Sequence, residues 1–411
     1  MGPEPLALAL SGGGDSRALL SVAAKWAVLR ARPLIAFTVD HRLNPQSEDW
    51  TRAAGKAACD EGVEWAPLIW AEASAGAGVQ ARARQARHTL LADAARAAGA
   101  RFILLGHTLN DVAENRWMQQ DGGTLGDLRE WSPSPIWPQG RGLVLLRPML
   151  GERREVLRDY LVSQAKGWID DPANEDSHYQ RVRARKALCG NAAPVEPAPL
   201  KPFEWTEGPL AQYGVLEFSR EALVKAGGRA LAVALVSASG QARLPRGDRL
   251  EALRQRLAGG EIFTAVLSGA RLEAQAQKVL ILREAGEMSR SGLTALSLQA
   301  GGPAVWDGRF EITIERPDCH IVPARGLMAK LSDEDRVILA NMPVSARPIQ
   351  PVLVCPRTAS PVLAYGKAKL LSLVATRFRL NCPVRMGETT QEAVLFASTH
   401  GEKRSTTLFS V

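Results

Sequence analysis

The first 190 residues of the chain are predicted to form an α/β domain, in which helices cover both faces of a parallel β-sheet. Two observations predict this fold. Short apolar runs of strand length alternate with stretches of helix length, and a glycine-rich turn joins the first strand to the first helix. Strand–helix–strand units of this kind place their helices against the sheet. A mainly helical domain and a small α+β C-terminal domain are predicted to follow.

The elements of this domain follow from the apolar pattern. Strands are predicted where an apolar run is short and uninterrupted, and helices where Ala, Arg and Leu recur between such runs. The predicted strands are Leu6–Leu10, Leu34–Val39 and Phe102–Leu105, and the predicted helices are Ser16–Leu29, Gln46–Glu61 and Val79–Ala98. Ligands of such sheets bind at the carboxyl ends of the strands, so the residues directly after each strand are the first candidates for a site.

Beyond residue 190 the pattern changes twice. Residues 191–204 are rich in proline, which is typical of a linker. Residues 205–289 are predicted to form the mainly helical domain, and residues 290–411 the small basic α+β domain. The elements expected in these domains are an amphipathic helix at Arg249–Leu257 and short strands at Val279–Leu282, Phe310–Glu315 and Val352–Cys355.

The composition excludes several classes of protein. With 46% apolar and 23% charged residues, the 411-residue chain is neither disordered nor fibrous. Its longest apolar window, Leu231–Ala238, is much shorter than the roughly 20 residues of a membrane-spanning helix. No basic segment precedes the apolar run at the N-terminus, so no secretory signal is predicted. The five cysteines are scattered without a CxxC pair, which favours isolated buried thiols in a reducing cytoplasm over disulfides or a zinc site.

The net charge of +8 is concentrated in the second half of the chain. The first 190 residues carry 24 basic and 22 acidic side chains, whereas the residues from Arg336 onward carry 10 basic and 3 acidic ones. This surplus favours a polyanionic partner, above all nucleic acid, through contacts with phosphates. A solvated basic surface is the alternative that charge alone leaves open. The expected contacts are Lys367, Lys369, Arg377 and Arg379.

The most specific motif follows the first strand and consists of Ser11-Gly12-Gly13-Gly14-Asp15-Ser16. Three consecutive glycines let the backbone turn tightly and bring its N–H groups close to a ligand. The helix that begins here adds the positive end of its dipole, so the turn is suited to phosphate. It is not a Walker loop, because no GK[ST] follows, and it lacks the GxGxxG spacing of dinucleotide folds.

Polar residues also follow the other two predicted strands. Asp40 and His41 end the second strand, while His107, Asp111 and Glu114 follow the third on one face of a helix. Carboxylates that share a face can hold Mg²⁺ through oxygen, with the phosphates of a ligand completing the shell. Acidic residues that only favour a helix N-terminus are the alternative.

Two basic segments flank these groups. Arg84 and Arg87 lie three residues apart on a predicted helix, where their guanidinium groups suit phosphate or carboxylate, or else form a solvated face. The segment Asp171-Pro172-Ala173-Asn174 is a turn signal. The arginines that follow it, Arg181, Arg183 and Arg185, would form a basic helix start suited to an RNA backbone.

In this order and spacing the motifs resemble the tRNA(Ile)-lysidine synthetase family. The resemblance covers about residues 6–186 and comprises SGGGDS, VDHRL, an RxxR helix, GHxxxDxxE, RPML and DDPANEDxxxxRxRxR. The last segment separates this family from other enzymes with a pyrophosphate loop. The resemblance implies that residues 1–190 are an N-type ATP pyrophosphatase domain, which is Rossmann-like, and that residues 205–289 bind tRNA.

The resemblance also implies a two-step reaction in the cytoplasm, with ATP and Mg²⁺. Such enzymes adenylate the carbonyl oxygen at carbon 2 of the wobble cytidine of a tRNA(Ile) with a CAU anticodon, and they release pyrophosphate. The side-chain amine of free L-lysine then displaces AMP and forms lysidine.

Each residue that matches a family motif receives an implied role. ATP would be bound by Ser11, Gly12, Gly13, Gly14, Asp15, Ser16, Asp40 and His41. The catalytic residues would be Asp15, Arg87, His107, Asp111 and Glu114, of which Asp111 and Glu114 would lie near Mg²⁺ and lysine. The tRNA would be contacted by Asp171, Asn174, Arg181 and Arg185.

The chain departs from the family's pattern at three positions. Asn44 and Asp121 stand where the family usually has a basic residue, and Thr108 replaces the second histidine of a His-His pair. Three other functions share part of the pattern: a tRNA thiolase with the same loop, a catalytically inactive tRNA-binding protein, and an amide-forming ligase on a small substrate. Thiolases generally need paired cysteines, which this chain lacks, and the intact loop and carboxylates favour an active enzyme.

Overall fold

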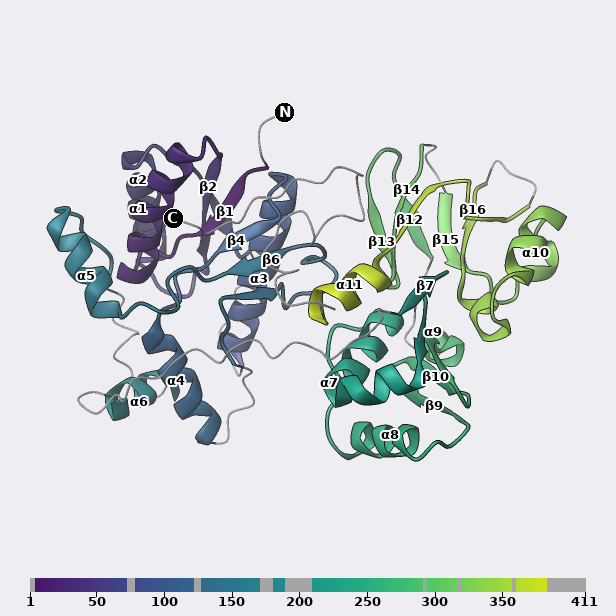
Figure 1. The fold of residues 1–411 in the computed structure, drawn as a ribbon. Helices are drawn as coiled ribbons and strands as arrows, with labels where there is room; N and C mark the ends of the chain where they lie inside the picture. The colour runs from purple at the N-terminus through teal and green to yellow at the C-terminus, as the bar shows by residue number, and fades with distance from the viewer. Residues whose placement is uncertain are drawn as a thin grey trace. The chain divides into compact units, whose positions relative to one another are not determined.

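The computed structural model describes residues 4–71, 78–121, 127–170, 180–188, 209–290, 293, 295–315, 319–356 and 360–382. The chain folds into two compact units, residues 1–201 and 202–411 (Figure 1). The boundary between the units lies within the predicted linker, residues 191–204, which falls outside the described residues.

Among the described residues, the first unit contains one six-stranded sheet with the strand order β3-β2-β1-β4-β6-β5. Neighbouring strands are parallel except for β5 and β6, which are antiparallel. The strands are β1 (Leu6–Ala9), β2 (Leu34–Asp40), β3 (Glu64–Ile69), β4 (Phe102–Leu104), β5 (Trp131–Pro133) and β6 (Val144–Leu146). The helices are α1 (Gly14–Leu29), α2 (Ser47–Asp60), α3 (Val79–Ala97), α4 (Leu109–Gln120), α5 (Arg154–Ser163) and α6 (Gln180–Leu188).

Helices cover both faces of this sheet, as the sequence predicts. On one face Ala7, Phe37 and Ile103 form a core with Leu91 and Ala95 of α3. Successive residues of a strand point to opposite faces, so the neighbours of Ala7 in β1 face the other side. Figure 1 shows α1 and α2 on that side of the sheet and α3 on the first. The three predicted strands and three predicted helices are confirmed, each within two residues at either end.

The parallel register brings the carboxyl ends of four strands to one edge. Leu8 of β1 pairs with Ala36 of β2 and with Leu104 of β4, and Leu104 pairs in turn with Leu146 of β6. The loops that follow β1, β2, β4 and β6 therefore lie side by side at this edge. These four loops hold most of the residues that the sequence predicts for the site.

The described part of the second unit contains three separate sheets. Their strand orders are β7-β8-β11-β10-β9, β12-β15-β16-β17 and β13-β14-β18. The strands are β7 (Leu210–Gln212), β8 (Val215–Ser219), β9 (Phe263–Leu267), β10 (Ala270–Ala274), β11 (Lys278–Arg283), β12 (Leu296–Leu298), β13 (Ala304–Trp306), β14 (Phe310–Thr313), β15 (Cys319–Pro323), β16 (Pro351–Val354), β17 (Val362–Leu363) and β18 (Lys369–Ser372). The helices are α7 (Arg220–Ser239), α8 (Asp248–Ala258), α9 (Ala285–Arg290), η2 (Met328–Lys330), α10 (Asp333–Ala340), η3 (Val344–Ile349) and α11 (Leu373–Asn381).

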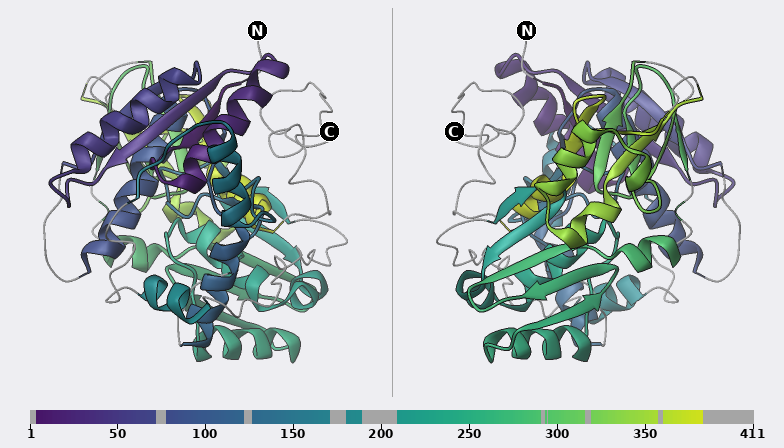
Figure 2. Two further views of the ribbon diagram at one scale, coloured as in Figure 1. Left: turned by 90° about the vertical axis from the view of Figure 1, so that its left-hand side faces the viewer. Right: turned by 90° about the vertical axis from the view of Figure 1, so that its right-hand side faces the viewer.

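The region predicted to be mainly helical has more described residues in helices than in strands, and α7 packs against the five-stranded sheet (Figure 1, Figure 2). The predicted helix at Arg249–Leu257 is confirmed as α8, and the predicted strand at Val279–Leu282 is confirmed as β11. The other four strands of that sheet were not predicted. The helix α11 lies well beyond the predicted boundary at residue 289. Its Val374 and Phe378 nevertheless pack into the core formed by α7 and this sheet, so that core contains residues from both predicted domains.

The basic C-terminal residues do not all face solvent. Lys367, Lys369 and Arg379 are exposed, but Arg377 is only 7% exposed, and its guanidinium donates a hydrogen bond of 2.9 Å to the backbone oxygen of Val236. Burial lowers the pKa of Arg377 to about 9. The expectation that Arg377 contacts a polyanion is therefore wrong, because the residue holds α11 against α7.

The prediction that all five cysteines are isolated buried thiols is also wrong. Cys319 and Cys355 form a disulfide. They are opposite one another across β15 and β16, whose register pairs His320 with Val354, so their side chains leave the same face of the sheet. Cys59 is exposed and Cys382 is buried, and both are free. Cys189 lies outside the described residues.

One described helix, α7, has the length and apolar composition of a membrane span. Two-thirds of its apolar window is nevertheless buried inside the second unit, as in the core helix of a folded domain. At Gly227 the backbone adopts φ 83° and ψ −176°, which interrupts the helix. The continuous helical part after this glycine is too short to cross a bilayer.

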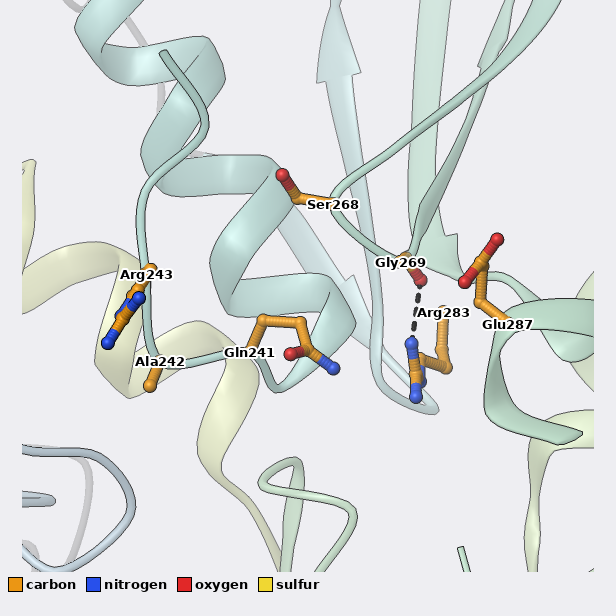
Figure 3. Close-up of a pocket in the computed structure, with 7 residues that line it drawn as sticks. All are labelled: Gln241, Ala242, Arg243, Ser268, Gly269, Arg283 and Glu287. Atoms are coloured by element: carbon orange, nitrogen blue, oxygen red, sulfur yellow. Dashed lines mark hydrogen bonds between the residues drawn. The ribbon is translucent and has the colours of Figure 1, made fainter. Parts of the chain in front are cut away.

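The second unit also contains a pocket of about 530 Å³ beside the turn between β9 and β10 (Figure 3). The residues that line it are Gln241, Ala242, Arg243, Ser268, Gly269, Arg283 and Glu287. Arg283 donates to the backbone oxygen of Gly269 at 3.1 Å and is also paired with the buried Asp307. None of these residues is among those that the sequence predicts for the site.

Candidate active site

The glycine-rich turn closes on itself through its two serines. Ser16 Oγ donates to the backbone oxygen of Gly13 at 2.9 Å, and it lies 3.0 Å from Ser11 Oγ. The helix α1 begins directly after Gly13, and no described side chain caps it. Its first N–H groups are therefore available to an anion, with the positive end of the helix dipole behind them.

Gly12 and Gly106 are required by close approaches of the backbone. Gly12 has φ +84°, and a Cβ atom there would overlap the side chain of Ile169, whose N–H donates to the Gly12 oxygen at 2.9 Å. Gly106 follows β4, and a Cβ atom there would lie 3.0 Å from the backbone of Ser16. The end of β4 thus lies directly against the start of α1.

Three carboxylates and three arginines meet beside this turn. Asp15 lies at the start of α1, whereas Asp111 and Glu114 lie on one face of α4 as predicted, and both are buried. Arg154, the first residue of α5, contacts all three: its Nε donates to Asp15 at 3.0 Å, and its terminal nitrogens lie 3.3 Å from Glu114 and 3.8 Å from Asp111. Two arginines of α6 also contact these carboxylates: Arg181 bonds Asp111 at 3.1 Å and Glu114 at 3.0 Å, and Arg185 bonds Glu114 at 2.8 Å.

The pKa values of these groups reflect burial opposed by charge. Burial raises the pKa of Asp15 above its ordinary value, although Arg154 opposes the shift. For Asp111, burial acts in the same direction, but Arg181, His107 and Arg154 outweigh it and hold the pKa below its ordinary value. Burial alone would lower the pKa of Arg154, whereas Asp15 and Glu114 raise it. Asp15 therefore takes up a proton more readily than Asp111.

Thr108, which replaces a histidine of the family's usual pattern, has a clear local role. Its backbone N–H and its hydroxyl donate to Asp111 Oδ2 at 2.8 and 2.9 Å, and the two residues form a capping box at the start of α4. A capping box satisfies N–H groups that the helix itself leaves unpaired. Thr108 therefore fixes the direction of the Asp111 carboxylate.

His107 and Arg147 are joined at the same edge of the sheet. Arg147 follows β6 and is 7% exposed, and its Nε donates to Nδ1 of His107 at 3.2 Å. Burial lowers the pKa of His107 to about 3; Asp111 opposes the shift, while Arg147, Arg181 and Arg87 add to it. His107 is therefore neutral at physiological pH.

The helix α3 contributes further basic side chains near His107. Burial lowers the pKa of Arg87 to about 10, and the neighbouring charges of Arg84 and Arg181 act in the same direction. His88 is buried next to these arginines and has a pKa of about 3 for the same reason. His88 Nε2 and His41 Nδ1 are buried without a hydrogen-bond partner in the described structure.

Asp40 and His41 lie at the end of β2, as predicted. Asp40 is 7% exposed and accepts a hydrogen bond of 2.8 Å from the backbone N–H of Arg42. His41 packs edge-on against Trp70, and burial and the charge of Arg87 lower its pKa. The end of β2 thus places a neutral imidazole, backed by the buried Trp70 that follows β3, beside the glycine-rich turn.

Most of the residues predicted for the site are therefore brought together at one edge of the sheet. Arg181 and Arg185, predicted to contact tRNA, instead hold Asp111 and Glu114 in this structure. Asp171 and Asn174 fall outside the described residues. Arg147 and Arg154 belong to the site, but no role was predicted for them. Arg147 begins the RPML motif, whereas Arg154 lies outside every motif.

The arrangement combines a phosphate-binding turn with buried carboxylates and fixed guanidinium groups. Such a site can bind a nucleoside triphosphate, stabilise charge that develops on a phosphorus centre, and hold a cationic amine against carboxylates. The Asp15 Oδ1 atom is buried and accepts no hydrogen bond in the described structure, so it is free to bind a cation. No group of three or more metal-ligating side chains occurs among the described residues.

Comparison with known proteins agrees with this geometry. A sequence model of the PP-loop domain family matches residues 2–192. A tRNA(Ile)-lysidine synthase from Caulobacter vibrioides is 42% identical over 388 residues, which covers 91% of this chain and 92% of that protein. Proteins of the same name from Hyphomonas neptunium and Brucella anthropi are 33% and 31% identical, and the matches cover 69% and 75% of this chain and 83% and 73% of those proteins.

Among solved structures, the U34-tRNA thiolase NcsA from Methanococcus maripaludis with its [4Fe-4S] cluster is similar to this chain. The match covers 45% of this chain and 64% of that one, with a TM-score of 0.38 and 16% sequence identity.

Proposed function

The chain belongs to the tRNA(Ile)-lysidine synthase family, and from this premise we propose that it ligates free L-lysine to the wobble cytidine of tRNA(Ile) with a CAU anticodon. The chain covers almost the whole length of a relative with that name. The observation that carries the proposal is the meeting of Asp15, Asp111 and Glu114 beside the glycine-rich turn. The enzyme is a ligase that uses ATP, and its proposed location is the cytoplasm.

ATP binds with its phosphates on the turn from Ser11 to Ser16. The free N–H groups at the start of α1 face the phosphates, and the serine hydroxyls hold the turn in shape. Asp40 and His41 end the neighbouring strand, where the nucleoside would lie. The neutral His41 ring and Trp70 favour a flat, uncharged base over a charged group there.

Mg²⁺ fits this site through Asp15. Its Oδ1 atom has no hydrogen-bond partner in the described structure, and Mg²⁺ prefers one or two carboxylates together with substrate phosphates. When bound, the ion neutralises charge on the phosphates. Asp111 and Glu114, predicted as ligands, bond arginines here, so they would reach the ion only after those bonds open.

In the first step, oxygen 2 of cytidine attacks the α-phosphorus, and the bond to the pyrophosphate oxygen breaks. Negative charge develops on the α-phosphate oxygens, and Arg87, which keeps its proton at physiological pH, would stabilise it. His107 is neutral and can donate a hydrogen bond without changing its charge. The products are adenylated cytidine and pyrophosphate.

In the second step, the lysine side-chain amine attacks carbon 2, and AMP leaves with the oxygen. Lysine arrives as an ammonium ion and must lose a proton before it attacks. In the structure Asp111 and Glu114 bind guanidinium groups. The same carboxylates therefore suit the incoming ammonium, and one of them would accept its proton.

The tRNA is the proposed partner of the second unit and of α6. Arg181 and Arg185 are about one-third exposed, so each could turn from the carboxylates toward a backbone phosphate. Asp171 and Asn174 stay proposed contacts. In the second unit Lys367, Lys369 and Arg379 are exposed and supply positive charge.

The test is incorporation of radiolabelled lysine into tRNA(Ile) with CAU in the presence of Mg-ATP. The proposal expects incorporation by the wild-type protein and its loss in Asp15→Ala and Glu114→Ala. Glu155→Ala, a change of an acid on the neighbouring helix α5, serves as the matched control and keeps activity. Incorporation of sulfur instead of lysine would indicate a thiolase, and ATP binding without turnover would indicate an inactive tRNA-binding protein.

A further inference from the structure

Arg147 is held in one orientation at the edge of the first sheet. The backbone places it directly after β6, where its own N–H bonds to the oxygen of Glu130. Nη1 donates to the backbone oxygen of Arg129 at 2.9 Å, and Nη1 and Nη2 both lie 3.2 Å from Ser132 Oγ. The remaining donor, Nε, is thereby directed at Nδ1 of His107, 3.2 Å away.

This hydrogen bond has only one possible direction. Burial, assisted by the charge of Arg84, lowers the pKa of Arg147 to about 10, so the guanidinium keeps its protons at physiological pH. A guanidinium has donors and no acceptor. His107 Nδ1 must therefore carry a lone pair, and the proton of the neutral ring must lie on Nε2.

The opposite side of the ring is open. His107 is half-buried, and its Nε2 atom is neither hydrogen-bonded within the described structure nor among the buried unpaired atoms. The ring follows β4 at the same edge as the phosphate-binding turn, because Gly106 lies directly against Ser16. Nε2 thus presents an N–H group to the space in which the substrates would lie.

We propose that Arg147 is a positioning residue that holds His107 in its Nε2–H tautomer. His107 then acts as a neutral hydrogen-bond donor toward an anionic oxygen of the nucleotide, and not as a proton acceptor. The identity of that oxygen rests on the proposed function, whereas the tautomer does not. In the adenylation step the oxygen belongs to the α-phosphate or to the departing pyrophosphate.

The tautomer can be measured directly by nuclear magnetic resonance on protein labelled with ¹⁵N-histidine, through long-range couplings between ring protons and ring nitrogens. The chain has six histidines, and the signals of His107 are assigned by their loss in His107→Gln. The wild-type protein is expected to show an unprotonated Nδ1 and a protonated Nε2 near neutral pH. A protonated Nδ1 would overturn the proposal without the need for any Arg147 variant.

The variant Arg147→Met tests whether Arg147 sets the tautomer of His107. It is expected to shift His107 to a mixture of tautomers and to lower kcat several-fold, which is less than the roughly 100-fold cost of losing one oriented donor in every molecule, with a smaller change in KM for ATP. Arg141→Met, on the same segment, is the control and leaves both the tautomer and kcat unchanged. An unchanged His107 tautomer in Arg147→Met would contradict the positioning role.

Failure of the proposed function gives a different result. If the wild-type spectrum shows the expected tautomer but no lysine enters tRNA, the proposed reaction is wrong and the tautomer assignment stands. If lysine is incorporated while His107 carries its proton on Nδ1, the proposed function stands and this inference is wrong.

Discussion

Arg154 donates a hydrogen bond of 3.0 Å from its Nε atom to Oδ2 of Asp15, and so joins the first residue of α5 to the start of α1. The same guanidinium reaches Glu114 and Asp111 on α4. Three elements that are distant in sequence are thereby fixed around one positive charge. The carboxylates of the site depend on this arginine for their spacing.

Replacing Arg154 by Met is expected to destabilise the first unit and to abolish activity. The change leaves buried carboxylates without part of their compensating charge, which typically costs about 3 kcal/mol of unfolding free energy. Urea unfolding and pyrophosphate release measure the two effects. Arg158→Met on the same helix is the control, because Arg158 is half-exposed and its ion pair is with the exposed Asp170. Equal behaviour of the two variants would show that Arg154 does not organise the site.

Gly12→Ala is expected to weaken ATP binding. Alanine at this position carries the strain of φ +84° and overlaps the end of the Ile169 side chain, so the turn or that side chain must shift. Gly62→Ala is a matched control, since Gly62 has φ +69° but no atom within 4 Å of the added Cβ. Both variants carry the backbone cost of about 1 kcal/mol, and only Gly12→Ala adds the overlap. Calorimetric titration with ATP distinguishes them, and normal affinity in Gly12→Ala would contradict the role of the turn.

The protein is expected to lose stability as the pH falls from about 6.5. Burial, with nearby arginines, lowers the pKa of His88 from 6.5 to about 3, so between these values the unfolded chain binds a proton that the folded protein does not. The unfolding free energy therefore decreases with falling pH, by at most about 1.4 kcal/mol per pH unit for this group. Urea titrations across this range measure the slope.

The control for this prediction is His88→Gln, whose side chain does not titrate. The slope of unfolding free energy against pH is expected to be smaller in the variant than in the wild-type protein. The same slope in both proteins would show that His88 is not held neutral.

Affinity for tRNA is expected to fall with added salt, and reversing exposed charges in the second unit should weaken that dependence. The variant combines Lys367→Glu, Lys369→Glu and Arg379→Glu. The slope of log K against log salt concentration should decrease by up to about 0.9 for each phosphate that the variant no longer neutralises. Reversal of the exposed Arg52 and Lys56 on α2 is the control. An unchanged slope would place the tRNA elsewhere.

The alternation of strands and helices predicts much of the first unit, because each buried strand there is a continuous apolar run. The strand β3 was missed because it lies at the sheet's edge, where exposed Glu64 and Pro67 interrupt the pattern. The second unit was predicted less well. Its strands are short and antiparallel, and their pairing depends on register, which also decides that Cys319 faces Cys355.

The site was predicted where residues follow strands directly, as with Asp15, Asp40 and His107. The roles of Arg147 and Arg154 could not be predicted from spacing, because each acts on a residue about 40 or more positions away in the chain. The burial of Arg377 was missed for a similar reason, since its partner Val236 lies on α7. The sequence alone does not show whether the fold places a hydrogen-bond acceptor beside a given basic residue.

The most direct measurement is the mass of the wobble nucleoside. Transfer RNA(Ile) with a CAU anticodon is incubated with the protein, Mg-ATP and lysine, then digested to nucleosides and examined by mass spectrometry. The wild-type protein is predicted to convert the wobble cytidine to lysidine, and Asp15→Ala and Glu114→Ala are predicted to leave cytidine. Unmodified cytidine, or a thiolated nucleoside, after incubation with the folded wild-type protein would contradict the account.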